Sequence, residues 1–241
     1  MLTPVIHAIR RALPAACIVC GQAAYKEYSI CDVCEPLLPR LGECCRRCGI
    51  EFGAALSKDR FCNSCLLRPP SFAMCCAAFP YVPPISKLVA NFKFSAGFDI
   101  GYSLSRILAR DFNAHYGTAE RPQLLLPVPL HSKRLSSRGF NQAREISRVL
   151  SRHCRVATSD SMLLKTRHTE AQTSMKSATA RKTNLRGAFS LRKVPNMEAV
   201  THIALVDDVV TTMATMETLS RLLRSQLGCR VDVWCLARAN R

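Results

Sequence analysis

Residues 203–216 read IALVDDVVTTMATM, and this stretch decides the fold class. An apolar run, typical of a buried strand, passes directly into Asp207 and Asp208, and two threonines and Met213 follow. Ligands of open α/β sheets bind at the carboxyl ends of the strands. We therefore expect both carboxylates to emerge at such an end, and Val209 to Thr215 to form a short loop that leads into a helix.

The two carboxylates and the threonines together indicate a ligand. Adjacent carboxylates repel each other unless a partner satisfies them. A ribose diol is such a partner, because its hydroxyls donate hydrogen bonds to carboxylates, and Mg²⁺ nearby would help. N–H groups at a helix N-terminus, with the hydroxyls of Thr211, Thr212 and Thr215, form a cradle for a phosphate. The stretch therefore predicts a ribose-5-phosphate site, although an Asp-Asp pair alone would favour a solvated turn or a structural metal site.

The rest of the chain after residue 70 alternates between strand and helix patterns. Apolar runs and spacings predict strands at 75–82, 123–129, 202–208 and 230–239, and helices at 85–92, 100–108, 140–150 and 215–227. Residues 158–185 are polar and basic, and we expect a mobile loop with short strand pieces there. Such alternation predicts an α/β fold with a mostly parallel sheet.

A cysteine-rich segment precedes this domain, and the prolines of RPPSF at 68–72 mark the boundary. We expect a cysteine-rich zinc module at 1–70 and the α/β domain at 71–241. The chain has 14 cysteines, and eight of the first nine form four Cys-x-x-Cys pairs, which in a cytosolic chain are more often metal ligands than disulfides. The eight predicted ligands are Cys17, Cys20, Cys31, Cys34, Cys45, Cys48, Cys62 and Cys65.

Two Cys-x-x-Cys turns close one tetrahedral Zn²⁺ site, with no open position for catalysis. Sequential pairing of the turns would give two small ribbons, whereas interleaved pairing would give a cross-braced module. One or two zinc ions are therefore expected, and Cys44 competes with Cys45 as a ligand. The remaining cysteines are expected to be core residues: Cys75, Cys76, Cys154, Cys229 and Cys235.

The charge is high and uneven. The net charge is +17, and residues 131–193 hold fifteen Lys or Arg against three Asp or Glu, a local charge of +12. This segment indicates a polyanionic partner, either small-molecule phosphates or nucleic acid, and the alternative is a solvated surface. No apolar run reaches the roughly 18 residues of a membrane span. The N-terminus does not have the pattern of a signal peptide, so we expect a cytoplasmic protein.

Several motifs carry a family resemblance. ALVDDVVTTMAT resembles the phosphoribosyl-pyrophosphate (PRPP) motif of type I phosphoribosyltransferases. LLPVPLHSKRLSSRGFNQA (125–143), RHTEAQTSM and ARKTNLRGAF (within 167–189) and the cysteine module resemble, in the same order, the ComF family of ComFC- and GntX-like proteins. The resemblance runs from about Cys17 to Arg238. It implies a type I phosphoribosyltransferase fold with helices on both sheet faces, an N-terminal zinc finger, and association with uptake or use of DNA in natural competence.

The resemblance also implies roles for individual residues. Asp207 and Asp208 would bind the ribose hydroxyls, with Mg²⁺, and would be the catalytic acids. Arg167, Gln172 and Arg181 would lie on a flexible loop that closes over the site. The implied PRPP-binding residues are Lys93, Val128, Pro129, Leu130, His131, Arg134, Arg138, Arg181, Asp207, Asp208, Val209, Val210, Thr211, Thr212, Met213, Ala214 and Thr215.

Met213 departs from the family pattern, which usually has glycine there. Glycine permits positive φ and close approach of the backbone to phosphate. Methionine adds a Cβ and a flexible side chain, which would loosen phosphate binding or reshape the mouth of the pocket.

Three hypotheses for function follow. The first is a phosphoribosyltransferase that displaces pyrophosphate at the ribose anomeric carbon, with an unidentified acceptor. The second is a non-catalytic adaptor of the DNA uptake machinery that binds single-stranded DNA. The third gives the zinc module only a docking role, toward competence or helicase proteins.

Overall fold

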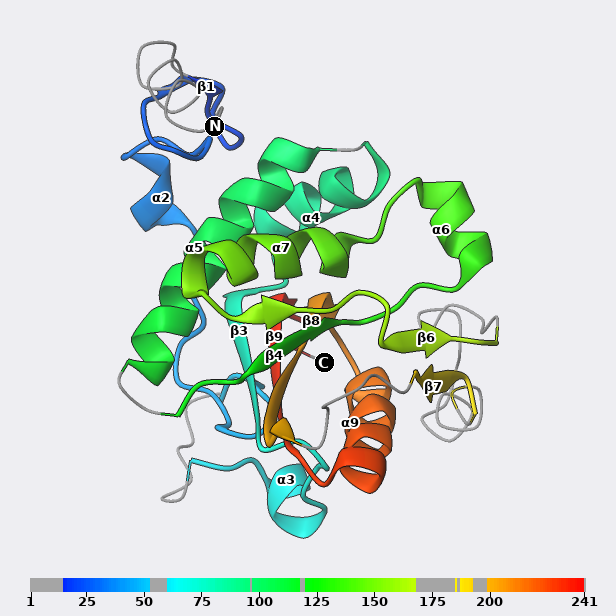
Figure 1. The fold of residues 1–241 in the computed structure, drawn as a ribbon. Helices are drawn as coiled ribbons and strands as arrows, with labels where there is room; N and C mark the ends of the chain where they lie inside the picture. Colours follow the sequence, from blue (N-terminus) through cyan, green and yellow to red (C-terminus); the bar gives the residue numbers. More distant parts are fainter. Residues whose placement is uncertain are drawn as a thin grey trace.

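The core of the protein is a five-stranded parallel sheet with the strand order β3-β9-β8-β4-β5 (Figure 1). The computed structural model describes residues 15–52, 60–95, 97–117, 120–167, 185, 187–192 and 199–240. The five strands are β3 (Met74–Pro80), β9 (Arg230–Arg238), β8 (His202–Val210), β4 (Leu124–Pro127) and β5 (Ala157–Thr158). The predicted α/β fold with a mostly parallel sheet is confirmed.

Helices cover both faces of this sheet, as predicted. One face carries α4 (Ile85–Phe94), α5 (Phe98–Tyr116) and α7 (Gln142–Cys154), and the other carries α9 (Ala214–Leu227). The apolar run of β8 divides between them, because successive strand residues point to opposite faces. Ala204 and Val206 join the α4–α5–α7 core, and Ile203 and Leu205 join the α9 core.

The acidic end of β8 differs from the prediction. Val209 and Val210 still pair with Ala237 and Arg238 of β9, so the strand continues to Val210. Asp207 and Asp208 lie in the strand, as the predicted strand at 202–208 has them, but two further strand residues follow them instead of the loop. The prediction of a loop from Val209 to Thr215 was wrong in extent: the connection consists of residues 211–213, and α9 begins at Ala214. The β-branched valines favour extended backbone and explain the longer strand.

Other differences concern short elements. Helix α6 (Ser132–Arg138) was not predicted, because it buries no residue and has no apolar stripe. The basic segment contains the expected strand pieces, β5 and β6 (Leu163–Lys165), and β6 pairs antiparallel with β7 (Phe189–Leu191). The predicted mobile loop falls mostly on residues 168–184, which lie outside the described residues.

The cysteine-rich segment forms two separate units. The first contains β1 (Ala15–Ala16), β2 (Ala23–Ala24) and α2 (Cys34–Leu37) and packs on α5, where the Ser29 N–H donates to Ser103 Oγ at 2.9 Å. The second contains α3 (Asn63–Leu67) and lies at the other end of the molecule, beside the sheet (Figure 1). Among the described residues, no helix is both long and apolar enough to cross a membrane.

Candidate zinc and phosphoribosyl sites

The eight paired cysteines form two metal-binding clusters. The thiol sulfurs of Cys17, Cys20, Cys31 and Cys34 lie within 4.8 Å of one another, and so do those of Cys45, Cys48, Cys62 and Cys65. The pairing is therefore sequential, and Cys44 belongs to neither cluster. Four thiolates in this arrangement are the donor set of a structural zinc site.

Backbone N–H groups favour the thiolate form that zinc requires. The N–H of Cys31 donates to Cys17 Sγ at 3.4 Å, and the N–H of Cys62 donates to Cys45 Sγ at 3.3 Å. Burial opposes ionisation, but such N–H donors outweigh it and lower the pKa of Cys17 to about 6 and that of Cys45 to about 7. Each cluster thus contains at least one thiol that is readily ionised at neutral pH.

One of the two acids of β8, Asp208, forms an ion pair with Lys93, which was among the predicted site residues. Lys93, near the end of α4, places its Nζ 3.2 Å from Asp208 Oδ2, and Asp208 is 8% exposed. Burial and the neighbouring Asp208 carboxylate together raise the pKa of Asp207 to about 8. The ligand-free pair therefore binds one proton at neutral pH, and a cation or a set of hydroxyl donors would relieve the repulsion.

The RGFNQ sequence at 138–142 organises the neighbouring loop. Phe140 packs on Phe92 and Phe98, with ring centroids 5.6 and 4.7 Å apart. Asn141 caps α7 by accepting from the Ala143 N–H at 3.0 Å, and its Nδ2 donates to the Val128 carbonyl at 3.0 Å. The motif therefore holds the start of the predicted pyrophosphate loop against α7.

Gln142 links two predicted cationic positions. Its Nε2 donates to the Lys93 carbonyl at 3.4 Å, and its Oε1 accepts from Arg138 Nη1 at 3.3 Å. Asn141 and Gln142 were quoted in the motif but were given no role, because their contacts to residues distant in sequence leave no local signal. Asn141 holds Val128, and Gln142 holds Lys93 and Arg138, so both residues position predicted site residues.

Three basic side chains of α6 and β6 form an electrostatically coupled group, and two of them, Arg138 and Lys165, interact with Asp207. Burial and the charge of Arg138 lower the pKa of Arg134, so these two predicted residues lie near each other. Burial and the charge of Arg134 lower the pKa of Lys165 to about 8, and Asp207 opposes that shift. The prediction missed Lys165 because it lies in a polar segment without periodicity. Arg181 and Gln172 lie outside the described residues.

The loop from 211 to 213 ends in an unusual backbone conformation. Met213 has φ 64° and ψ −6°, in the left-handed region, and it precedes the first residue of α9. The backbone therefore has the conformation for which glycine is best suited. Thr211 and Thr212 lie in the connection before α9 and Thr215 lies in its first turn, and a phosphate cradle at this end of the helix stays a prediction.

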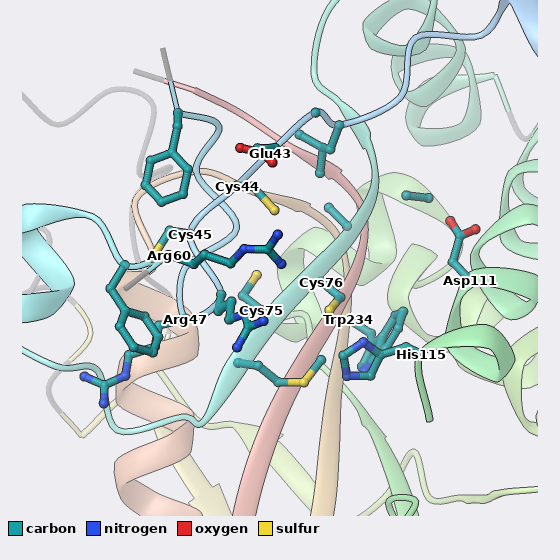
Figure 2. A pocket seen from close by; sticks show the side chains of 18 of the residues that line it. Glu43, Cys44, Cys45, Arg47, Arg60, Cys75, Cys76, Asp111, His115 and Trp234 are labelled. Atoms are coloured by element: carbon teal, nitrogen blue, oxygen red, sulfur yellow. The ribbon is translucent and has the colours of Figure 1, made fainter. Parts of the chain in front are cut away.

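A cavity of about 880 Å³ lies between the second cysteine cluster and β3. Figure 2 shows Arg47, Arg60 and Cys44 on its ribbon side and Cys76 and Trp234 on its sheet side. The Arg47 guanidinium stacks over the Phe61 ring at 4.8 Å. This cavity was not predictable from the sequence, because its walls come from both halves of the chain.

The fold and the two Cys₄ sites define a double-zinc-ribbon protein with an α/β domain built on a five-stranded parallel sheet. Residues 8–66 match the Double zinc ribbon domain.

The chain belongs to the ComF family. It is 34% identical to Competence protein F of Haemophilus influenzae, over 92% of this chain and 96% of that protein. It is also 33% identical to DNA utilization protein YhgH of Escherichia coli (strain K12), and 32% identical to that of Salmonella typhimurium. Each of these two matches covers 94% of this chain and 98% of the relative.

Proposed function

We propose that this protein binds PRPP with Mg²⁺ and acts in the uptake or use of DNA. The observation that carries the PRPP proposal is the ion pair between the buried Asp208 and the partly buried Lys93, beside Asp207 and just before the threonine-containing connection to α9. The names of the relatives, Competence protein F and DNA utilization protein, support the second part.

The proposed roles follow from position. Asp207 and Asp208 accept hydrogen bonds from the ribose hydroxyls, and the N–H groups of residues 211–215 bind the 5′-phosphate. Bound Mg²⁺ would offset the charge of the two carboxylates and of pyrophosphate. Arg134 and Arg138, both on α6, bind the pyrophosphate. The same arrangement suits displacement of pyrophosphate at the anomeric carbon, with catalysis by positioning and electrostatics, and the acceptor is a base or amine that remains to be identified.

Isothermal titration calorimetry with PRPP tests this proposal. Wild-type protein is expected to bind PRPP in the presence of Mg²⁺, and the Asp207→Asn/Asp208→Asn variant is expected to lose at least 100-fold in affinity. Asp32→Asn is a matched control, because Asp32 is an exposed carboxylate in the first ribbon. No binding by the wild type would overturn the proposal.

A second candidate function is binding of single-stranded DNA without catalysis. The cavity beside the second ribbon supports it, because the exposed Arg46 and Arg60 lie there with an arginine-stacked Phe61. Stacking aromatics and basic side chains are the usual means of holding single strands. The +12 segment, which includes Arg134 and Arg138, offers a second basic surface.

Fluorescence anisotropy with a labelled oligodeoxynucleotide separates the two surfaces. Arg46→Gln/Arg60→Gln and Arg134→Gln/Arg138→Gln are compared across salt concentrations, because each lost phosphate contact lowers the salt slope by about one. Binding that neither variant weakens would exclude both surfaces. We also propose that the protein docks to competence or helicase proteins and that it lies in the cytoplasm.

A further inference from the structure

A buried arginine joins the second ribbon to the phosphate loop. Arg238 is the last residue of β9 and is 3% exposed. Its Nε donates to the carbonyl of the zinc-cluster residue Cys48 at 2.8 Å. Its Nη1 donates to the carbonyls of Val210 and Thr211 at 3.0 and 2.6 Å. One planar guanidinium therefore holds a carbonyl of the ribbon and two carbonyls at the start of the loop.

Met213 makes a second, independent contact between the same two parts. Its side chain packs against the cluster of buried cysteines Cys45, Cys48 and Cys65, and also against the α9 core. The side chain thus fills the space between the ribbon and the loop. This contact offsets the cost of a left-handed backbone at a residue other than glycine.

Neighbouring residues strengthen this connection. The Ala239 N–H donates to the Val210 carbonyl at 3.0 Å, and Asn240 Nδ2 donates to Glu51 Oε2 at 3.0 Å. The first ribbon, by contrast, packs on α5, for example through Arg106 Nη1 and Glu27 Oε2 at 2.7 Å. The two ribbons thus have different neighbours, and the first provides an internal control for the second.

We propose that zinc in the second ribbon positions the phosphate loop, with Arg238 and Met213 as positioning residues. Zinc holds the Cys48 turn in place, and Arg238 transfers that constraint to Val210 and Thr211. Loss of zinc from this ribbon releases the loop, whereas loss from the first ribbon does not. The identity of the loop's ligand rests on the proposed function, but the ordering of the loop by the ribbon does not.

Hydrogen exchange of the backbone amides of residues 209–215 tests the proposal directly in the full chain. Cys62→Ser/Cys65→Ser empties the second cluster, and Cys17→Ser/Cys20→Ser empties the first. We expect exchange in this loop to accelerate at least tenfold in Cys62→Ser/Cys65→Ser and to stay within twofold of wild type in Cys17→Ser/Cys20→Ser. Exchange in α7 reports whether the domain remains folded. Equal loop exchange in both variants would overturn the proposal.

Arg238→Lys keeps the experiment decisive if emptying the second cluster unfolds the chain. Lysine retains the charge but lacks the planar fork that donates to the carbonyls of Cys48, Val210, Thr211 and Ala239. We expect both zinc ions to remain bound while loop exchange accelerates at least fivefold. Wild-type exchange in this variant would overturn the role of Arg238.

Ligand binding gives a reciprocal measurement, because coupling between two sites acts equally in both directions. PRPP with Mg²⁺ is expected to raise the zinc affinity of the Cys17→Ser/Cys20→Ser variant, which retains only the second cluster, in an equilibrium competition with a chromogenic chelator. The zinc affinity of Cys62→Ser/Cys65→Ser should not change. A wild-type protein that fails to bind PRPP would overturn the proposed function, whereas the exchange experiment would still decide the positioning role.

Discussion

Substitutions of Met213 by glycine and by alanine differ in two contributions to stability, backbone strain and backbone entropy. These two contributions have opposite signs. The left-handed backbone, with φ 64°, costs a non-glycine residue about 1–2 kcal/mol. Glycine avoids this cost but loses about 0.5–1 kcal/mol more backbone entropy on folding. Glycine at this position should therefore be more stable than alanine by about 0.5–1 kcal/mol, the reverse of their order inside a helix.

Loss of the methionine side chain lowers the stability of both variants relative to wild type. Met213 is half-buried, so removing its contacts with the second cysteine cluster costs about 1 kcal/mol, roughly half the value for a fully buried methionine. We expect Met213→Ala to be less stable than wild type by about 1 kcal/mol, and Met213→Gly to lie within about 0.5 kcal/mol of wild type.

Urea unfolding of the zinc-loaded proteins measures these differences, with equal m-values as the check that the same surface is exposed. Alanine equal to or more stable than glycine at this position would refute the conformational argument.

Three further predictions concern other parts of the molecule. Cys44→Ser should leave two zinc ions per chain by metal analysis, because Cys44 lies outside both clusters; a fall to one would contradict the assignment. With the pKa of Asp207 raised to about 8, Mg²⁺-dependent PRPP affinity should rise about tenfold between pH 6 and pH 7 and level off above pH 8, and a flat calorimetric profile would count against this. The third prediction concerns the substitution Asp232→Asn. Burial opposes ionisation of Asp232, but hydrogen bonds from His202 and Tyr116 hold its pKa below the usual value. This stabilisation is present at neutral pH and is lost as the pH falls below about 4. The substitution should therefore lower the free energy of unfolding by about 3 kcal/mol at pH 7, and a loss below 1 kcal/mol in urea titration would contradict the expectation.

The predictable features were those with a local signal. The apolar run before Asp207 and Asp208 identified the strand, and the Cys-x-x-Cys spacings identified the ligands. The spacing did not distinguish sequential from interleaved pairing, because every pair has the same local geometry. The strand extended past the acids because Val209 and Val210 pair with β9, a partner distant in sequence.

Lys165 and Arg238 show why the rest was not predictable. Lys165 lies in a polar segment, and its electrostatic interaction with Asp207 depends on the pairing of β6 with β7, which no local pattern predicts. Arg238 ends an apolar strand, where a charge usually marks the approach to solvent. Arg238 can be buried because its guanidinium donates to the Cys48 carbonyl of the second ribbon, which is 190 residues away in the sequence.

The contact between Arg238 and Cys48 limits how this protein can be divided or recombined. A fragment that begins at residue 71 would keep the sheet but would leave the buried guanidinium without one of its acceptors. Chimeras that exchange the N-terminal modules of two relatives should work best when residues 213 and 238 are exchanged with the second ribbon. We therefore expect the second ribbon and the loop at residues 211–213 to be exchanged as one unit, although the prolines at 69 and 70 lie between them in the sequence.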